Sequence, residues 1–139
     1  MQVKKVGDTL LVRIDRGEEI VKNLVQLQEE YNIQLAAISG IGAVGHVVYG
    51  VYDVEKQFYN SITKDGEMEI LSLVGNMSRM DGAPYLHTHI TLGDEAGNAI
   101  GGHLNEAVIS ATSEIFVRVL DGEVGREKDA ATGLNLWKF

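Results

Sequence analysis

The chain has 139 residues, of which 45% are hydrophobic and 23% charged, and this composition predicts a single domain over residues 1–139. Cysteine is absent, which excludes disulfides and thiolate zinc sites, so any metal must be held by His, Asp or Glu side chains. The net charge of −8 opposes direct binding to nucleic acid or to anionic membranes.

The N-terminal part is expected to form a strand and then a helix. Residues 9–14 alternate between apolar and mixed positions, which is typical of a strand. Residues 17–32 change to helical spacing, with an apolar stripe centred on Leu24. Glu18 and Glu19 come at the start of this segment, where the helix dipole favours acidic side chains.

The rest of the chain has the pattern of many short strands. These are expected at residues 33–39, 47–54, 57–62, 67–74, 107–111 and 113–122, with a turn at 64–67. The last residues, 134–139, are expected to add an edge strand or to cover a neighbouring subunit. One helix followed by closely spaced strands predicts an α+β fold, a mostly antiparallel β-sheet packed with one main helix. The absence of a long apolar run or an apolar leader favours a cytoplasmic protein without membrane contact.

Three glycines match the dinucleotide-binding fingerprint G-x-G-x-x-G, at Gly40, Gly42 and Gly45. That motif requires a helix to begin at the glycines, so that its N-terminus holds the pyrophosphate. Residues 46–54 are instead rich in β-branched and aromatic side chains, which is a strand pattern. We therefore expect a tight glycine turn between two strands, and no nucleotide site.

Three of the four histidines fall in residues 84–105. His87 and His89 share one face of a predicted strand, a turn follows at 93–98, and His103 lies on the next predicted strand. Matching the apolar faces of the two strands puts all three histidines on one side, and a pairing of His89 with His103 fits that register. Their imidazoles are then close enough to converge on one ion.

A site of three neutral imidazoles suits zinc, and also nickel, copper or iron with less selectivity. It leaves one coordination position open, which is the arrangement of catalytic zinc but also occurs in a purely structural site. The other interpretation is that the three histidines are ordinary strand residues that lie close in sequence. His46, near the glycine segment, is expected to be an ordinary strand residue, and its joining the site is the alternative. A cupin site also uses H-x-H, but the five residues between His89 and Glu95 and the absence of a second motif make that match poor.

Several segments together resemble the "plants and prokaryotes conserved" (PPC) domain. They are LVRIDRGEEIVKNL, AAISGIGAVGHVVYGVYD, EMEILSLVGNMS, PYLHTHITLGDEAGNAIGGHL and ISATSEIFVRVL, and they span nearly the whole chain. The resemblance implies the same fold class, a homotrimer, and a metal bound by His87, His89 and His103. It is to the stand-alone prokaryotic type, because the chain has no R-G-R-P segment of the AT-hook kind. DNA binding would therefore be inherited by family analogy alone.

Three functions compete on this basis. The first is a trimeric metal-binding module with a regulatory or ligand-binding role, whose partner is a small molecule. The second is a metal-dependent hydrolase or lyase that uses metal-bound water, for which Glu95, Glu106 and Glu114 are the nearest acidic candidates and none is assigned as catalytic. The third is a DNA-binding-associated protein, which the negative charge opposes.

Overall fold

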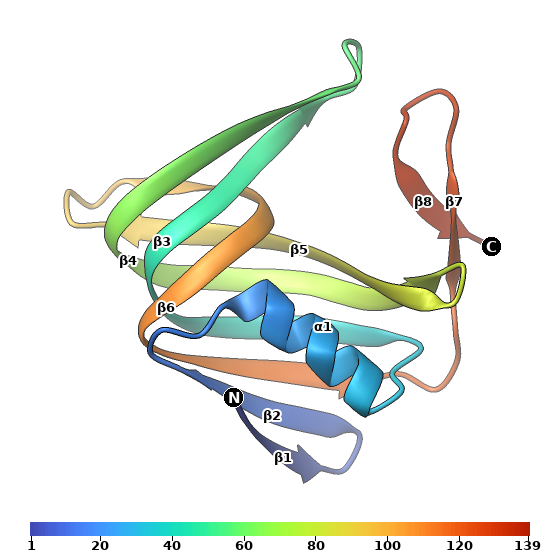
Figure 1. The fold of residues 1–139 in the computed structure, drawn as a ribbon, viewed down its shortest axis with the longest axis horizontal. Helices are drawn as coiled ribbons and strands as arrows, with labels where there is room; N and C mark the ends of the chain where they lie inside the picture. The colour runs from blue at the N-terminus through green and yellow to red at the C-terminus, as the bar shows by residue number, and fades with distance from the viewer.

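The computed structural model describes residues 1–139 and contains one helix and eight strands (Figure 1). The elements follow in the order β1 (Gln2–Val6), β2 (Thr9–Asp15), α1 (Ile20–Glu30), β3 (Ala36–Asp53), β4 (Phe58–Met80), β5 (Ala83–Asp94), β6 (Ala99–Val119), β7 (Gly125–Lys128) and β8 (Asn135–Lys138). The predicted α+β class is confirmed, because one helix packs against an entirely antiparallel sheet. No helix is long and apolar enough to cross a membrane.

The main sheet has six strands in the order β1-β2-β6-β3-β4-β5, and an additional β5–β6 pairing joins its far edge back to β6. Strands β6, β3, β4 and β5 therefore form a closed ring, and β2 and β1 extend from β6. β7 and β8 make a separate two-stranded sheet. Figure 1 shows two projections from this body, the β3–β4 hairpin arm and the β7–β8 hairpin.

The core lies between the inner face of the sheet and α1. The helix buries Ile20, Leu24 and Leu27 completely, which confirms the predicted apolar stripe. Glu19 is the N-cap residue, and its carboxylate accepts hydrogen bonds from the backbone N–H groups of the first turn. At the other end of the helix, the buried Gln28 donates from Nε2 to the Ser78 carbonyl oxygen of β4 at 2.6 Å.

The six predicted short strands join in pairs into three long strands, so three of the predicted boundaries between strands are wrong. Residues 33–39 and 47–54 belong largely to β3, 57–62 and 67–74 to β4, and 107–111 and 113–122 largely to β6. In each case the neighbouring strand offers backbone partners along the whole length, so turn-forming residues are absorbed as bulges in the ladder. These bulges bend the long strands, so that one strand serves both the body of the fold and the arm.

The predicted turn at 64–67 is wrong, because Lys64 and Asp65 remain paired with β3. A register shift follows, in which two residues of β4, Gly66 and its neighbour, lie opposite Gly45 alone. Gly66 adopts a φ of +116°, a conformation that only glycine reaches readily. A glycine that looks like a turn residue in the sequence is here the bulge residue of a strand.

The predicted glycine turn at Gly40, Gly42 and Gly45 is also wrong, because all three lie within β3. A Cβ atom on Gly42 would lie 2.5 Å from the Thr112 carbonyl oxygen of β6. This glycine therefore permits a close approach of two strands. No helix begins there, so the mechanism of the dinucleotide fingerprint is absent.

Candidate metal centre

The register of β5 against β6 decides where the three histidines lie. Ile90 and Leu92 of β5 are buried in the core, so His87 and His89 face the outer side of the sheet. His89 is paired directly with His103 of β6, as the matching of apolar faces predicted. The sheet therefore brings the three rings together on one surface.

The three rings converge at a distance that suits one ion. The centroid of the His87 ring lies 5.2 Å from that of His89 and 5.2 Å from that of His103, and the His89 and His103 centroids are 5.6 Å apart. One nitrogen of each ring lies within 4.8 Å of the others. Tetrahedral zinc with Zn–N bonds of 2.0–2.1 Å separates its nitrogen ligands by about 3.4 Å. Small side-chain rotations close that difference, so these residues fit a divalent transition metal.

None of the three rings makes a hydrogen bond to the rest of the chain, although His87 and His103 are each partly buried. His46, in contrast, has its Nδ1 2.6 Å from Asp65 Oδ1. Burial, with the neighbouring His103, His89 and Arg126 charges, lowers the pKa of His87 to about 4. Burial and His89 also lower the pKa of His103. Both imidazoles are therefore neutral at physiological pH, which is the form that binds a metal.

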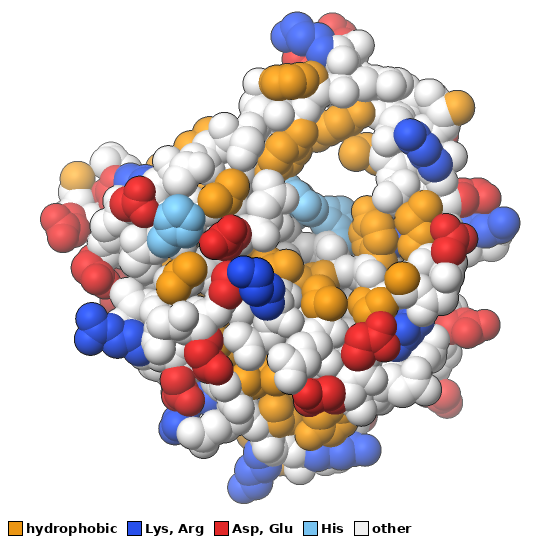
Figure 2. Space-filling model, in the orientation of Figure 1, with side chains coloured by type: hydrophobic (Ala, Val, Ile, Leu, Met, Phe, Trp, Pro, Cys, Tyr) orange, Lys and Arg blue, Asp and Glu red, His pale blue; other side chains and the backbone are white.

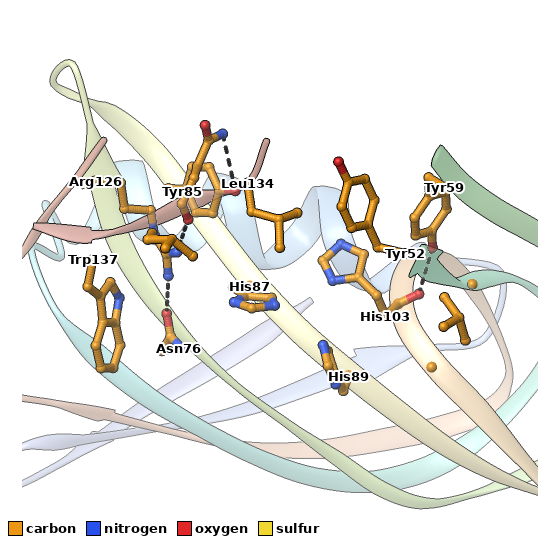
Figure 3. A pocket seen from close by; sticks show the side chains of 15 residues that line it. Tyr52, Tyr59, Asn76, Tyr85, His87, His89, His103, Arg126, Leu134 and Trp137 are labelled. Atoms are coloured by element: carbon orange, nitrogen blue, oxygen red, sulfur yellow. Dashed lines mark hydrogen bonds between the residues drawn. The ribbon is translucent and has the colours of Figure 1, made fainter. Parts of the chain in front are cut away.

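The histidines form the floor of a cavity of about 660 Å³. The β3–β4 arm and the β7–β8 hairpin stand on either side of it, and the pale blue histidines are visible at the bottom of the hollow in Figure 2. Figure 3 shows the wall from nearby, with three tyrosines, Arg126 and Trp137 around the imidazoles. A cavity of this size is within the range of small-molecule sites.

The carboxylates that are nearest to the histidines in sequence do not reach this cavity. Glu95, Glu106 and Glu114 are all absent from its wall, and no other Asp or Glu lines it. Glu95 lies in the turn after β5, and Glu114 is paired with Arg13 of β2, far along β6 from His103. This chain therefore places no carboxylate where it would serve as a general base beside the histidines.

Sequence reasoning missed the residues that come from the end of the chain. The expected strand in residues 134–139 forms as β8, which pairs with β7 in a separate sheet and carries Trp137 to the cavity. Arg126 on β7 also lines the cavity and is only 8% exposed. The short β7 segment GREK has no apolar alternation, so nothing in its pattern indicated a strand or a site.

Acidification is expected to leave the His87 ring neutral down to a pH of about 4 in the metal-free protein. An unfolded histidine binds its proton near pH 6.5, so between these values the unfolded state holds more protons than the folded state. Stability contributed by His87 is therefore present above pH 6.5 and is lost as the pH falls towards 4. An NMR titration of the ring Cε1–H measures this, and a His87 midpoint near 6.5 would contradict the buried environment.

Comparisons with known proteins show what the chain is similar to. The sequence model of the Plants and Prokaryotes Conserved (PCC) domain matches residues 1–121. A metal-containing protein from Archaeoglobus fulgidus is 42% identical, with 97% of this chain and 96% of that chain covered and a TM-score of 0.90. A Pyrococcus horikoshii plant- and prokaryote-conserved (PPC) protein is 32% identical, with coverage of 99% and 94% and a TM-score of 0.86.

A third solved structure, from Bacteroides thetaiotaomicron, is 34% identical and has a TM-score of 0.97, with coverage of 99% of this chain and 96% of that chain. It is called a DNA-binding protein only provisionally. No curated protein matches the chain.

Proposed function

Because this chain belongs to the Plants and Prokaryotes Conserved (PCC) domain family, we propose that it is a homotrimeric module that binds one divalent transition metal per chain. His87, His89 and His103 supply the ligands, and zinc is the simplest occupant of such a set. The module presents the ion to a small molecule in the adjoining cavity, in a regulatory or ligand-binding role.

The observation that carries the proposal is the convergence of three imidazoles that have no other hydrogen-bond partner. Three ordinary strand histidines would point into solvent or be satisfied by neighbouring groups. The description of the 42% identical Archaeoglobus fulgidus relative as metal-containing supports the same conclusion. A bound ion would keep an open coordination position on the cavity side and act there as a Lewis acid.

Assembly is supported by an exposed apolar patch on the outer face of the sheet. Ile41, Leu71, Val74 and Phe116 are each about half exposed, with fractions of 58%, 55%, 49% and 54%. They lie around one shallow depression formed by β3, β4 and β6. Val74 is also paired with His89, so a second copy seated on this patch would lie at the border of the metal centre.

A hydrolase or lyase that uses metal-bound water is the weaker candidate. Its support is the open coordination position, but the cavity wall holds no carboxylate to act as a base. Tyr59 does not replace one, because burial raises the pKa of its hydroxyl and the group donates to the His103 carbonyl oxygen at 3.1 Å. Binding without turnover is therefore the function that the residues support best.

Metal analysis of protein purified without a histidine tag tests the proposal. We expect about one transition-metal ion per chain, either as isolated or after zinc is added to stripped protein and the excess is removed. A content below about 0.1 ion per chain after zinc addition would contradict the proposal. Binding of duplex DNA at physiological salt with a steep salt dependence would instead favour the DNA-associated role.

A further inference from the structure

Arg126 is a charged residue buried in the cavity without a counter-charge. Only 8% of it is exposed, yet none of the ion pairs in the structure involves its guanidinium. Its three hydrogen bonds go to neutral acceptors: Nε donates to Ser78 Oγ at 2.7 Å, Nη1 to the Asn135 carbonyl oxygen at 2.9 Å and Nη2 to Asn76 Oδ1 at 2.8 Å. Buried charges in proteins are normally paired, so this arrangement needs an explanation.

A purely structural role accounts for only part of the arrangement. The hydrogen bonds to Ser78 and Asn76 attach the β7–β8 hairpin to β4, and the one to Asn135 joins β7 to β8. Hydrogen bonds to neutral acceptors do not by themselves require a positive charge on the donor. A guanidinium has five N–H groups, so one N–H on each terminal nitrogen of Arg126 remains without a partner in the chain. Those two N–H groups and the positive charge are available to an acceptor that the chain itself does not provide.

The surroundings of Arg126 fix the position of its planar guanidinium beside the histidines. Its Cζ lies 4.2 Å from the centroid of the Tyr85 ring and 5.8 Å from that of Trp137, so aromatic faces enclose the group. Asn76, which accepts from Nη2, is paired with His87 across β4 and β5. Figure 3 shows Arg126, Asn76 and His87 along one side of the cavity.

The charge of the cavity is opposite to that of the chain. The chain carries a net charge of −8, whereas the wall of the cavity includes Arg126 and no Asp, Glu or Lys. A metal ion on three neutral imidazoles would add further positive charge. Tyr52, Tyr59, Tyr85 and Trp137 give the same wall broad, flat, largely apolar surfaces.

We infer that the cavity binds a small organic acid with a flat apolar or aromatic body, whose anionic group pairs with the two free N–H groups of Arg126. The inference rests on the proposed function in one respect, since a second polar group of the same molecule would complete the coordination of the ion. A guanidinium binds a carboxylate through two parallel N–H···O bonds, which a neutral amide cannot reproduce. The aromatic wall selects the body of the molecule and Arg126 selects its charge.

The single tryptophan of the chain makes this binding measurable, because Trp137 lines the cavity. The test titrates benzoate, benzamide and acetate into metal-loaded and metal-stripped protein and follows tryptophan fluorescence. Benzoate is expected to bind about 10- to 100-fold more tightly than benzamide, the range of a hydrogen-bonded charge pair. Acetate, which lacks the flat body, is expected to bind more weakly than benzoate.

The variants R126Q and R126K separate the role of the positive charge from that of the two parallel N–H groups of the guanidinium. R126Q is expected to lose the preference for benzoate over benzamide, and R126K to keep part of it. Equal binding of benzoate and benzamide by the wild type would overturn the inference. An R126Q protein that is folded by circular dichroism and still prefers benzoate as the wild type does would also overturn it. If R126Q does not fold, the wild-type comparison and R126K decide the matter.

Metal content measured on the same samples distinguishes the two proposals. Full metal loading without a preference for benzoate overturns the role of Arg126 and leaves the metal centre intact. Failure to take up metal overturns the proposed function, and the titration of that same protein still shows whether Arg126 confers the preference.

Discussion

Replacing His89 by alanine is expected to abolish stable metal binding and to weaken zinc affinity by at least about a hundredfold. Loss of a residue that only hydrogen-bonds to a ligand already weakens metal affinity by about 10- to 100-fold, and loss of the ligand itself costs more. His89 is two residues from His87 on β5 and is paired directly with His103 of β6. Two imidazoles on one ion do not form the three-ligand set that holds zinc.

The same variant should lose the stabilisation that zinc gives to the folded protein. A ligand present at about a thousandfold above its Kd stabilises the native state by about 4 kcal/mol. Thermal unfolding with and without zinc measures this difference directly. The wild type should show a large upward shift of Tm on zinc addition, and H89A should show almost none.

His46→Ala is the matched control, because His46 lies on β3 outside the cluster and is hydrogen-bonded to Asp65. It should keep the wild-type metal content and the zinc-dependent shift in Tm. Equal loss of metal in H46A and H89A would show that binding is nonspecific, and unchanged metal content in H89A would remove His89 from the ligand set.

Replacing Phe116 by glutamate is expected to break the proposed trimer into monomers. Phe116 is 54% exposed and lies on the β6 side of the apolar patch, where it is paired with Ser39 of β3. Ser39 is paired in turn with Val74 of β4, so Phe116 and Val74 belong to one continuous surface. A glutamate there would bring a charge, and three such charges in a closed assembly, into an apolar interface without a partner. Analytical ultracentrifugation should show one species of trimer mass for the wild type and one of monomer mass for F116E.

Val6→Glu provides the control for this experiment. Val6 is also about half exposed, with a fraction of 51%, but it lies on the edge strand β1, which β2 separates from β6 and the patch. It should leave the assembly unchanged. A monomeric wild type would contradict the trimer outright, and an F116E protein that stays trimeric would place the interface elsewhere.

The arrangement of the histidines follows from local rules that operate within the sequence itself. The apolar faces of β5 and β6 must both point into the core, and this alone sets His89 opposite His103. The helix could be predicted in the same way, because Ile20, Leu24 and Leu27 repeat at helical spacing and are all buried. Both features depend on patterns within a short stretch of chain.

The features that could not be predicted depend on residues far apart in the sequence. Gly66 continues a strand because β3 supplies partners on both sides of it, and no property of the segment 64–67 indicates that. β1 lies in a segment of only five residues that the sequence left unassigned, and its strand conformation depends on its pairing with β2.

Arg126 was missed for a similar reason. It reaches the histidines only because its hydrogen bonds to Asn76 and Ser78, about 50 positions away, fasten the β7–β8 hairpin over β4. Hydrophobic periodicity contains no information about such polar contacts. The wall of the cavity is therefore a product of tertiary structure, whereas its floor of histidines could be read from the sequence.

X-ray absorption spectroscopy at the edge of the metal found in tag-free protein tests the three-histidine site without a crystal, because it reports the atoms bound to the ion. We expect three imidazole nitrogens at about 2.0–2.1 Å and one further light-atom ligand from solvent or a small molecule. A spectrum with only oxygen ligands, or no metal above background after zinc addition, would contradict it.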